Sequence, residues 1–434
     1  MVNMAELLEN LFFIVCLALL AWGLIRRERI YQYPFFMGAI FIAFIRPQAT
    51  AIIGNPGVVS QPALERVLLF SCLCAAASWL GYQLKPNANW IAKFHIPLNQ
   101  RRLFEAGLIL LSISYACNFV LSRITIQVTA TGTWTGPATI LVFFAQVIYI
   151  AFTIFLLRFL QKPSIANVVW VALASIQPLN DIVLVGRRQP TMTFLIIIGL
   201  CFWLVRRSMP PRWVFIIAVT ALVYVIPLVG ELRGDFWMLI FQRDWQAIIN
   251  ASQQSFDNLR DGEVLELRNA AVLMDAAEKS GQYGFGTGFW DRLVFQYVPG
   301  QIVGYEVKSS LQFNWTQYDL GGMYGYVMPT GTTPTGVGDS FVEFGYFGCL
   351  VFALIAYLFK SVWVPAVYLN STVSQLLYIG LLSPAMVGVT HGIGRFLQEA
   401  VFQFIVVFWI RHYARVKDPI ALSPQRLTSY MRSG

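Results

Sequence analysis

The sequence predicts an all-α polytopic integral membrane protein. Of its 434 residues, 57% are hydrophobic and only 12% are charged, and the mean hydropathy is +0.61. So few charges cannot cover the surface of a water-soluble globule. Apolar runs of roughly 20 residues, the length that crosses a bilayer as a helix, recur along the chain. Basic residues follow or precede these runs in an alternating order, which is typical of a multi-pass protein.

We expect about 11 transmembrane helices. The predicted spans are 7–25, 34–54, 63–84, 103–121, 137–160, 165–185, 190–205, 212–230, 343–360, 372–389 and 396–411. They divide the chain into a first membrane domain with about eight spans (1–230), a large external loop (231–342), a second membrane domain with about three spans (343–411) and a basic tail (412–434).

The first span fixes the orientation. Met1 to Asn10 contains no Lys or Arg, whereas Arg26, Arg27 and Arg29 follow the apolar stretch. This order does not fit a cleaved signal peptide, which has a basic leader. Because basic residues collect on the cytoplasmic side, we place the N-terminus outside the cell and the C-terminus inside. Every predicted cytoplasmic turn is then basic: Lys85, Lys93, Arg101, Arg102, Arg158, Lys162, Arg206, Arg207, Arg212, Lys360, Arg411, Arg415 and Lys417.

The large external loop is acidic and contains a predicted amphipathic helix. The stretch 231–343 has 14 acidic and 7 basic residues, a net charge of −7 in a chain of +9. After the turn at Asp261, which can cap a helix, apolar residues recur at three- and four-residue intervals up to Gly281, at Val264, Leu267, Ala271, Met274 and Ala277. We expect this helix to pack on the membrane domain or to lie in the membrane interface.

Glycine, proline, threonine and aromatic residues dominate the rest of the loop. Loops of this kind on a rigid scaffold often carry binding residues. The candidates for stacking on sugar rings are Trp290, Tyr297, Tyr324 and Tyr326, with Trp315 and Tyr318 in the same region. Aromatic residues also form interfacial belts and loop cores, and that alternative stays open for each of them.

Several classes of function are excluded by missing patterns. The chain has no phosphate-binding loop, dinucleotide fingerprint, Gly-x-Ser-x-Gly elbow or Asp-x-Asp pair. All six cysteines fall in or beside predicted spans, and none has the spacing of a metal site or a disulfide framework. The positive charge is accounted for by cytoplasmic turns, so it does not indicate a nucleic-acid partner. We therefore expect no metal, no cofactor and no nucleic acid.

Arg187 and Arg188 depart from the charge rule, because they fall in an external turn between two spans. An arginine pair there favours a site for an anionic headgroup or a phosphorylated substrate; contact with lipid phosphates is the alternative. Asn180 and Asp181 stand at the outer end of the preceding span, where polar residues are costly and often functional, although pairing with the two arginines would also explain them.

Four short patterns occur in a suggestive order. They are Gly186-Arg-Arg-Gln-Pro190, Tyr297-Val-Pro-Gly300, the stretch from Thr333-Pro334 through Gly338-Asp339 to Glu343-Phe-Gly345, and His391-Gly-Ile-Gly-Arg395. In this order, over most of the chain, they resemble the Wzy-type family of O-antigen or oligosaccharide repeat-unit polymerases. O-antigen ligases share much of the arrangement. The position after Gly338, often glutamate in the family, is Asp339 here, and Glu343 follows one helical turn later.

The resemblance implies a metal-independent glycosyltransferase at the periplasmic face of the bacterial inner membrane. Its substrate would be undecaprenyl-pyrophosphate-linked oligosaccharide, and membrane lipid, a chain-length regulator and a flippase are the implied partners. Pyrophosphate-binding candidates are Arg187, Arg188, Arg233 and Arg395, because guanidinium groups neutralise a departing pyrophosphate without a metal. Pairing with neighbouring acids for Arg233, and interfacial anchoring for Arg395, are the alternatives.

A base must remove the proton of the acceptor hydroxyl. His391 is preferred on its chemistry, with Asp339 and Glu343 next, although a lone histidine at a helix end is more often structural. An O-antigen ligase and, less favoured, a lipid-linked oligosaccharide transporter remain as other functions. A transporter would be expected to have inverted repeats and ionisable residues near the middle of the membrane.

Overall fold

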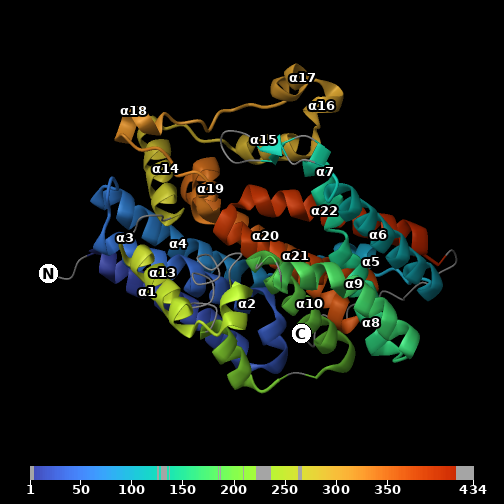
Figure 1. Cartoon of the computed structure of the whole chain (residues 1–434). Helices are drawn as coiled ribbons and strands as arrows, with labels where there is room; N and C mark the ends of the chain where they lie inside the picture. Colours follow the sequence, from blue (N-terminus) through green and yellow to red (C-terminus); the bar gives the residue numbers. More distant parts are fainter. Residues whose placement is uncertain are drawn as a thin grey trace.

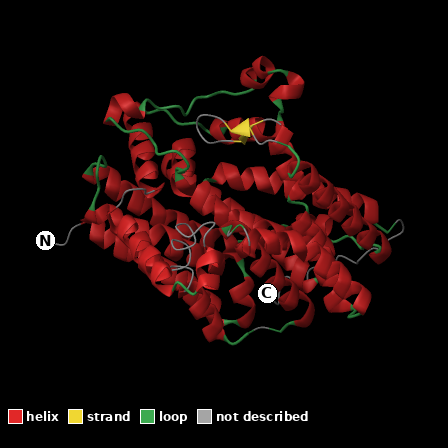
Figure 2. Cartoon of the chain, in the orientation of Figure 1, coloured by secondary structure: helices red, strands yellow, loops and turns green. Residues whose placement is uncertain are grey.

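The computed structural model describes residues 4–124, 127–128, 134–135, 137–183, 185, 187–208, 210–220, 236–261 and 266–416. Most of these residues are helical (Figures 1 and 2). The strands β1 (Gln127–Val128) and β2 (Trp134–Thr135) form one short antiparallel pair. The predicted all-α polytopic membrane fold is confirmed.

Ten helices in the described part of the chain are long and apolar enough to cross a membrane. They are α1 (Met4–Ile25), α2 to α3 (Tyr33–Ile40, continued by Phe41–Ile45 and Arg46–Gly54), α4 (Gln61–Gln83), α6 (Gln100–Leu121), α7 to α8 (Pro137–Ala145 and Ile148–Gln161), α9 (Ile165–Val183), α10 (Arg188–Arg206), α19 to α20 (Thr335–Phe344 and Cys349–Tyr368), α21 (Thr372–His391) and α22 (Ile393–Ala414). Ten of the eleven predicted spans coincide with them. The other, 212–230, is helical over 212–220, and its remainder lies outside the described residues.

The basic turns predicted to be cytoplasmic gather at one end of the helix bundle. Arg207, after α10, donates a hydrogen bond to the carbonyl of Val367 near the end of α20. Arg158, near the end of α8, donates to the carbonyl of Gln100 at the start of α6. The backbone of α6 meets the end of α22, where the Asn99 amide donates to the Ala414 carbonyl. We call this the basic end, and the other the opposite end.

Helices α4 and α20 pack closely because α4 has a glycine at the crossing. A Cβ atom on Gly81 would lie 2.0 Å from the backbone oxygen of Ala353 in α20, so a side chain there would push the helices apart. Helix α4 begins at the cap Ser60, whose hydroxyl accepts a hydrogen bond from the Ala63 amide. Its buried hydroxyls Ser71 and Ser78 donate to the carbonyls one turn earlier, so neither is left unsatisfied.

The segment that links α10 to α19 contributes seven further described helices. These are α12 (Phe236–Gln242), α13 (Trp245–Asp261), α14 (Glu266–Ser280), α15 (Thr287–Tyr297), α16 (Gly300–Val303), α17 (Tyr305–Ser310) and α18 (Leu320–Tyr324). Helices α14 to α18 lie above the bundle in the view of Figure 1, around the outer end of α19. This group is called the outer layer below.

The predicted amphipathic helix is present as α14, and it packs against α4 and α19 as expected. Leu267, Ala271, Met274 and Ala277 are all buried, and Val264, the first residue of the predicted pattern, lies outside the described residues. Gly281, with a φ of +64°, follows the helix as predicted. Asp261 is the last residue of α13 and therefore does not cap α14, so that detail of the prediction was wrong.

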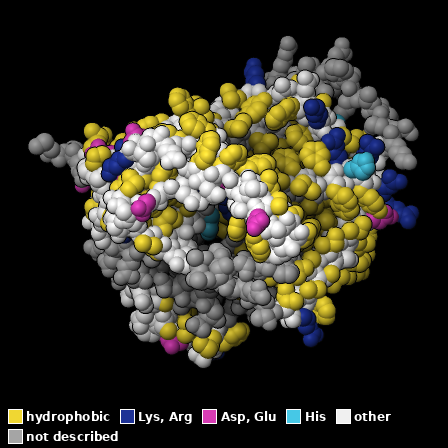
Figure 3. Space-filling view, turned by 90° about the horizontal axis from the view of Figure 1, so that it is seen from above, with side chains coloured by type: hydrophobic (Ala, Val, Ile, Leu, Met, Phe, Trp, Pro, Cys, Tyr) yellow, Lys and Arg dark blue, Asp and Glu magenta, His cyan; other side chains and the backbone are white. Residues whose placement is uncertain are grey.

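The outer face of the molecule is largely apolar or uncharged, with charged side chains mainly near its rim (Figure 3). Helices α15 to α17 contribute large exposed apolar side chains, namely Phe295, Ile302, Val303, Tyr305 and Val307. Exposed apolar residues on short helices are typical of segments that lie in a membrane interface.

Candidate functional site

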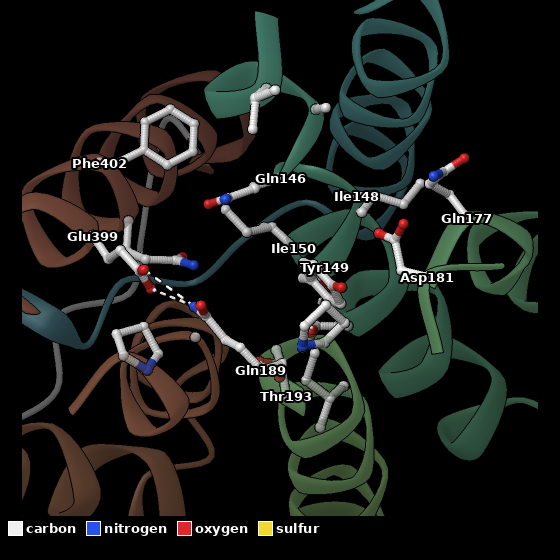
Figure 4. Close-up of a pocket in the computed structure, with 18 of the residues that line it drawn as sticks. Gln146, Ile148, Tyr149, Ile150, Gln177, Asp181, Gln189, Thr193, Glu399 and Phe402 are labelled. Atoms are coloured by element: carbon white, nitrogen blue, oxygen red, sulfur yellow. Dashed lines mark hydrogen bonds between the residues drawn. The ribbon is translucent and has the colours of Figure 1, made fainter. Parts of the chain in front are cut away.

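A cavity of about 390 Å³ lies between α8, α9, α10, α21 and α22 (Figure 4). It starts at the opposite end of the bundle, where α9 ends and α10 begins, and runs inward along α21 as far as Leu376. Ile148, Ile150, Ile197 and Phe402 supply apolar lining. The polar lining combines amides, hydroxyls, two carboxylates and a guanidinium: Asn118, Gln146, Tyr149, Thr153, Gln177, Asp181, Arg187, Gln189, Thr193, Glu399 and Gln403. We call it the membrane cavity.

Glu399 joins two turns that the sequence separates by about 200 residues. Its carboxylate pairs with Arg395 one turn earlier in α22, at 3.0 Å, and accepts hydrogen bonds from the Gln189 side chain at 3.1 and 3.4 Å. Figure 4 shows this contact at the wall of the cavity. Two of the predicted patterns, around Arg187 and around Arg395, therefore meet at one buried carboxylate.

Arg187 lines the membrane cavity together with Asp181. Its backbone N–H donates to the Asp181 carbonyl at 3.1 Å, and its carbonyl accepts from the Thr191 hydroxyl at 2.8 Å. The chain thus turns tightly from α9 into α10 and holds the start of α10 beside the cavity. Arg188 is the first residue of α10, and its side chain is outside the described residues, as is the whole of Arg233.

His391 lies at the last position of α21 and is exposed. Its Nδ1 atom is 2.6 Å from the Thr390 hydroxyl, and it is not among the residues that line the membrane cavity. Gly392 follows with a φ of +110°, a conformation that favours glycine, and allows α22 to begin at once. His391 thus precedes Arg395 closely in the sequence, but it does not line the membrane cavity.

Asp339 is buried in α19 and fully engaged. Its two oxygens accept hydrogen bonds from Arg292 of α15 at 2.6 and 3.1 Å, and one of them also accepts from the Gly394 amide of α22 at 2.9 Å. This one carboxylate therefore connects α15, α19 and α22. An Arg–carboxylate pair with two contacts is both strong and directional.

Glu343 follows Asp339 by one helical turn and is likewise buried. Its Oε2 atom accepts hydrogen bonds from the backbone amides of Gly286 at 2.7 Å and Gly288 at 3.3 Å. Glu343 thus holds the beginning of α15, and Asp339 holds its middle. Neither acid lines the membrane cavity.

Three of the four predicted sugar-binding aromatics have their hydroxyl groups engaged within the protein. Tyr297 donates to the Gln398 carbonyl at 2.5 Å, and burial raises the pKa of Tyr297 to about 12. The hydroxyl groups of Tyr324 and Tyr326 donate to side chains of α14. Trp290 has 49% of its surface exposed, and its Nε1–H donates to the Leu311 carbonyl. Of the four, Trp290 therefore offers the most open ring face.

Glu399, Gln189 and Arg292 were not singled out from the sequence. A signal existed for Glu399, because Arg395 and Glu399 have the spacing of a helical ion pair. Gln146, Gln177 and Gln403 are polar residues within apolar stretches, which is itself a mark of a site inside a membrane protein. No local pattern identifies the partner of Arg292, because Asp339 is 47 residues away.

No group of three or more metal-binding side chains occurs within the described ranges. The chain matches no family model, no curated protein and no solved structure. The resemblance to the Wzy-type family thus rests on the order of short patterns, and the membrane cavity supplies an independent, structural basis for considering function.

Proposed function

We propose that this protein is a glycosyltransferase that joins undecaprenyl-pyrophosphate-linked oligosaccharide repeat units into a surface polysaccharide, such as O-antigen or exopolysaccharide. The observation that carries the proposal is the junction at Glu399. It connects the turn that carries Arg187, before α10, with the first turn of α22, which carries Arg395, at the wall of one cavity. A guanidinium, carboxylates and several amides then surround a space that lies among transmembrane helices.

The lining chemistry suits a lipid-linked sugar. Amide and hydroxyl side chains donate and accept hydrogen bonds, as sugar hydroxyls require, while the isoleucines and Phe402 provide apolar contact for the lipid part. Arg187 supplies a permanent positive charge for the pyrophosphate, and its planar group can hold two phosphate oxygens at once. Charge that develops on the leaving pyrophosphate is stabilised in this way without a metal.

The acceptor hydroxyl has to lose a proton as it attacks the sugar carbon that carries the pyrophosphate. Asp181 lies in the cavity with Arg187 and is the carboxylate placed to accept that proton, since Glu399 is paired with Arg395 and Gln189. Asp339 has both oxygens engaged, and Glu343 lies outside the cavity. His391 stays a prediction as a base, because its position at the end of α21 adjoins Arg395.

The proposed location is the bacterial inner membrane. The basic end of the bundle would face the cytoplasm with the C-terminus, in line with the preference of Lys and Arg for that side. The N-terminus, the outer layer and the mouth of the membrane cavity would then face the periplasm. A flippase that delivers the lipid-linked units and a chain-length regulator are the proposed partners.

Two other functions fit part of the same geometry. An O-antigen ligase would use the same donor and differ only in its acceptor, the lipid A core. A transporter of lipid-linked oligosaccharide is favoured by one feature, the carboxylates Asp181 and Glu399 in a cavity between spans, since such groups often mark a transport path.

The surface glycan of a deletion strain, compared on a gel with that of a complemented strain, separates the three. A polymerase defect leaves lipid A core with a single repeat unit. A ligase defect leaves bare core and long chains on the lipid carrier, and a transporter defect leaves bare core without long chains. An unchanged ladder in the deletion strain would refute all three assignments.

A further inference from the structure

A second cavity, of about 210 Å³, lies in the outer layer between α15, the loop after Leu311 and α19. It shares no lining residue with the membrane cavity. Glu343 forms part of its wall, together with Asn314, Thr316 and Gln317. We call it the outer cleft.

Glu343 has one carboxylate oxygen that the protein leaves available. The residue is only 2% exposed, and its Oε2 atom takes both backbone hydrogen bonds from α15 and the turn before it. No described residue donates a hydrogen bond to Oε1. Oε1 is not among the buried polar atoms that lack a partner, so it is reached from the cleft that Glu343 lines. The oxygen is therefore suited to a donor group that enters the cleft.

Gly288 lets the Glu343 carboxylate lie directly against the start of α15. A Cβ atom at position 288 would lie 2.1 Å from Glu343 Oε1 and 3.1 Å from the Thr316 hydroxyl. Any side chain at 288 would thus collide with the carboxylate and displace it from the wall of the cleft. The Glu343 carboxylate and the Thr316 hydroxyl therefore both lie at the edge of the outer cleft.

The other charged groups of the cleft are already paired. Asp339 is held by Arg292, and both oxygens of Asp291 accept backbone N–H groups, from Phe313 and Asn314 at 2.8 Å each. No group of three metal-binding side chains occurs in the described part of the chain, so the cleft does not suit a divalent cation. What remains is one carboxylate oxygen, one hydroxyl and the two amide side chains at 314 and 317, of which Gln317 donates one hydrogen bond to Asn314 at 3.0 Å.

We propose that the outer cleft binds a single sugar residue of a carbohydrate ligand, with Glu343 Oε1 accepting a hydrogen bond from a sugar hydroxyl. Carboxylates, amides and hydroxyls match the dense hydroxyl groups of a sugar, and the cleft is smaller than the ~300 Å³ at which sites for drug-sized molecules begin. The proposal does not depend on the reaction at the membrane cavity. It gives Glu343 a binding role at a site separate from that cavity.

The walls of the outer cleft and of the membrane cavity are connected through the beginning of α22. Asp339, in the wall of the cleft, bonds to Gly394, and the next residue is Arg395, which pairs with Glu399 of the membrane cavity. A carbohydrate chain bound in the cleft by one residue would thus extend across the start of α22. If the proposed function holds, the cleft holds a glycan while its lipid-linked end occupies the membrane cavity.

Saturation-transfer NMR on the purified full-length protein tests this proposal. The probes are glucose, galactose, N-acetylglucosamine and rhamnose at millimolar concentrations, and the detergent must carry no sugar headgroup. We expect at least one sugar to bind the wild type. Glu343→Gln should weaken it at least about 10-fold, because a hydrogen bond to a charged group contributes ~1.5–3 kcal/mol. Thr316→Val should weaken it less.

The glutamine variant is chosen because its side-chain oxygen can still accept the amides of Gly286 and Gly288 while its NH₂ replaces Oε1. Glu306→Gln, the same change at an exposed position of α17, serves as the control and should bind like the wild type. If Glu343→Gln fails to fold, Thr316→Val decides alone. No binding by any of the four sugars, or unchanged binding in every folded cleft variant, would overturn the proposal. Because the readout is binding, its failure is distinct from a failure of the polymerase assignment.

Discussion

Arg292 and Asp339 form a two-contact ion pair that fixes α15 of the outer layer to α19 of the membrane domain. The Asp339 side chain is 6% exposed, whereas that of Arg292 is 35% exposed. Removing the arginine would leave a buried carboxylate with only the Gly394 amide as a donor. Because the buried carboxylate depends on the more exposed arginine, loss of this ion pair should destabilise the outer layer.

Arg292→Ala should therefore destabilise the protein. Loss of one partner of a buried pair costs about 3 kcal/mol, the low end of the usual range because Arg292 is partly exposed. The measurement is the unfolding midpoint in mixed micelles with increasing SDS. Arg101→Ala, which breaks an exposed pair with Glu105, is the matched control and should leave the midpoint nearly unchanged. Equal midpoints for the two variants would contradict the structural role of Arg292.

Arg187→Ala should abolish polymer while the protein stays in the membrane at wild-type amounts. Removing one donor that stabilises developing negative charge typically costs about 100- to 1,000-fold in rate. The measurement is the length distribution of the surface glycan in a complemented deletion strain, with a membrane immunoblot for protein amount. Arg101→Ala, at the basic end, should give the wild-type ladder. Long chains from Arg187→Ala would refute its assignment to the pyrophosphate.

Arg395→Ala should also abolish polymer, for a related reason. It removes the cation next to Glu399 and leaves that carboxylate in the cavity wall with Gln189 as its partner. Glu399→Gln should be less severe, because the amide oxygen can still accept the hydrogen bond from Gln189. The same glycan ladder distinguishes the two variants. An equally complete loss in Glu399→Gln would mean that the ion pair as a whole is required, and not the cation at 395 alone.

The contact of α14 with the bundle should weaken in acid. Burial alone would raise the pKa of Asp275, but hydrogen bonds from Lys279, Tyr324 and Arg66 hold it below its ordinary value. A lowered pKa in the folded state means that the stabilisation is present above the unfolded value of about 3.9 and is lost as the pH falls through the folded value.

Thermal unfolding of the purified protein between neutral pH and pH 3 measures this effect. The wild type should begin to lose stability below about pH 4, where Asp275 takes up a proton in the unfolded state, and should lose more as the pH falls towards the lowered folded pKa. Asp275→Asn should unfold at a lower temperature at neutral pH and show a flatter dependence on pH. The idea fails if the variant and the wild type have parallel pH profiles.

Gly81→Ala tests the close packing of α4 on α20. The added Cβ atom would meet the Ala353 backbone at 2.0 Å, so the helices must separate. Overpacking of this kind costs ~1–3 kcal/mol. Gly54→Ala is the control, since a Cβ atom there meets nothing within 4 Å. The SDS-unfolding midpoint should fall for position 81 alone, and a matching fall at 54 would argue against a steric cause.

The sequence predicts the membrane fold well because its signals are local. A run of about 20 apolar residues can be recognised without knowing what it packs against, and the basic turns share one end as the charge rule predicts. The helix at 266–280 was also predictable, because its apolar residues follow the helical period. Asp261 was wrongly predicted to cap this helix, because the stretch before it is also helical and Asp261 is its last residue.

The candidate site was less predictable because it depends on contacts between distant residues. Arg187 was identified from its unusual place in an external turn, yet Glu399, which lines the same cavity and bonds to Gln189, follows more than 200 residues later. Asp339 and Glu343 were singled out as possible bases, and the structure places both outside the membrane cavity, in contact with α15. A sequence pattern can show that an acid is unusual, but whether that acid anchors a helix or faces a ligand depends on its partners.

The anchoring of α15 by α19 and α22 has a consequence for biosynthesis. Residues 287–297 leave the ribosome well before Asp339, Glu343 and Gln398, the residues that hold them in place. The outer layer thus cannot acquire its final position until the last two spans, α21 and α22, have entered the bilayer. A nascent chain that stops before α22 would expose an unanchored outer layer, so proteolytic sensitivity of this region reports whether membrane insertion is complete.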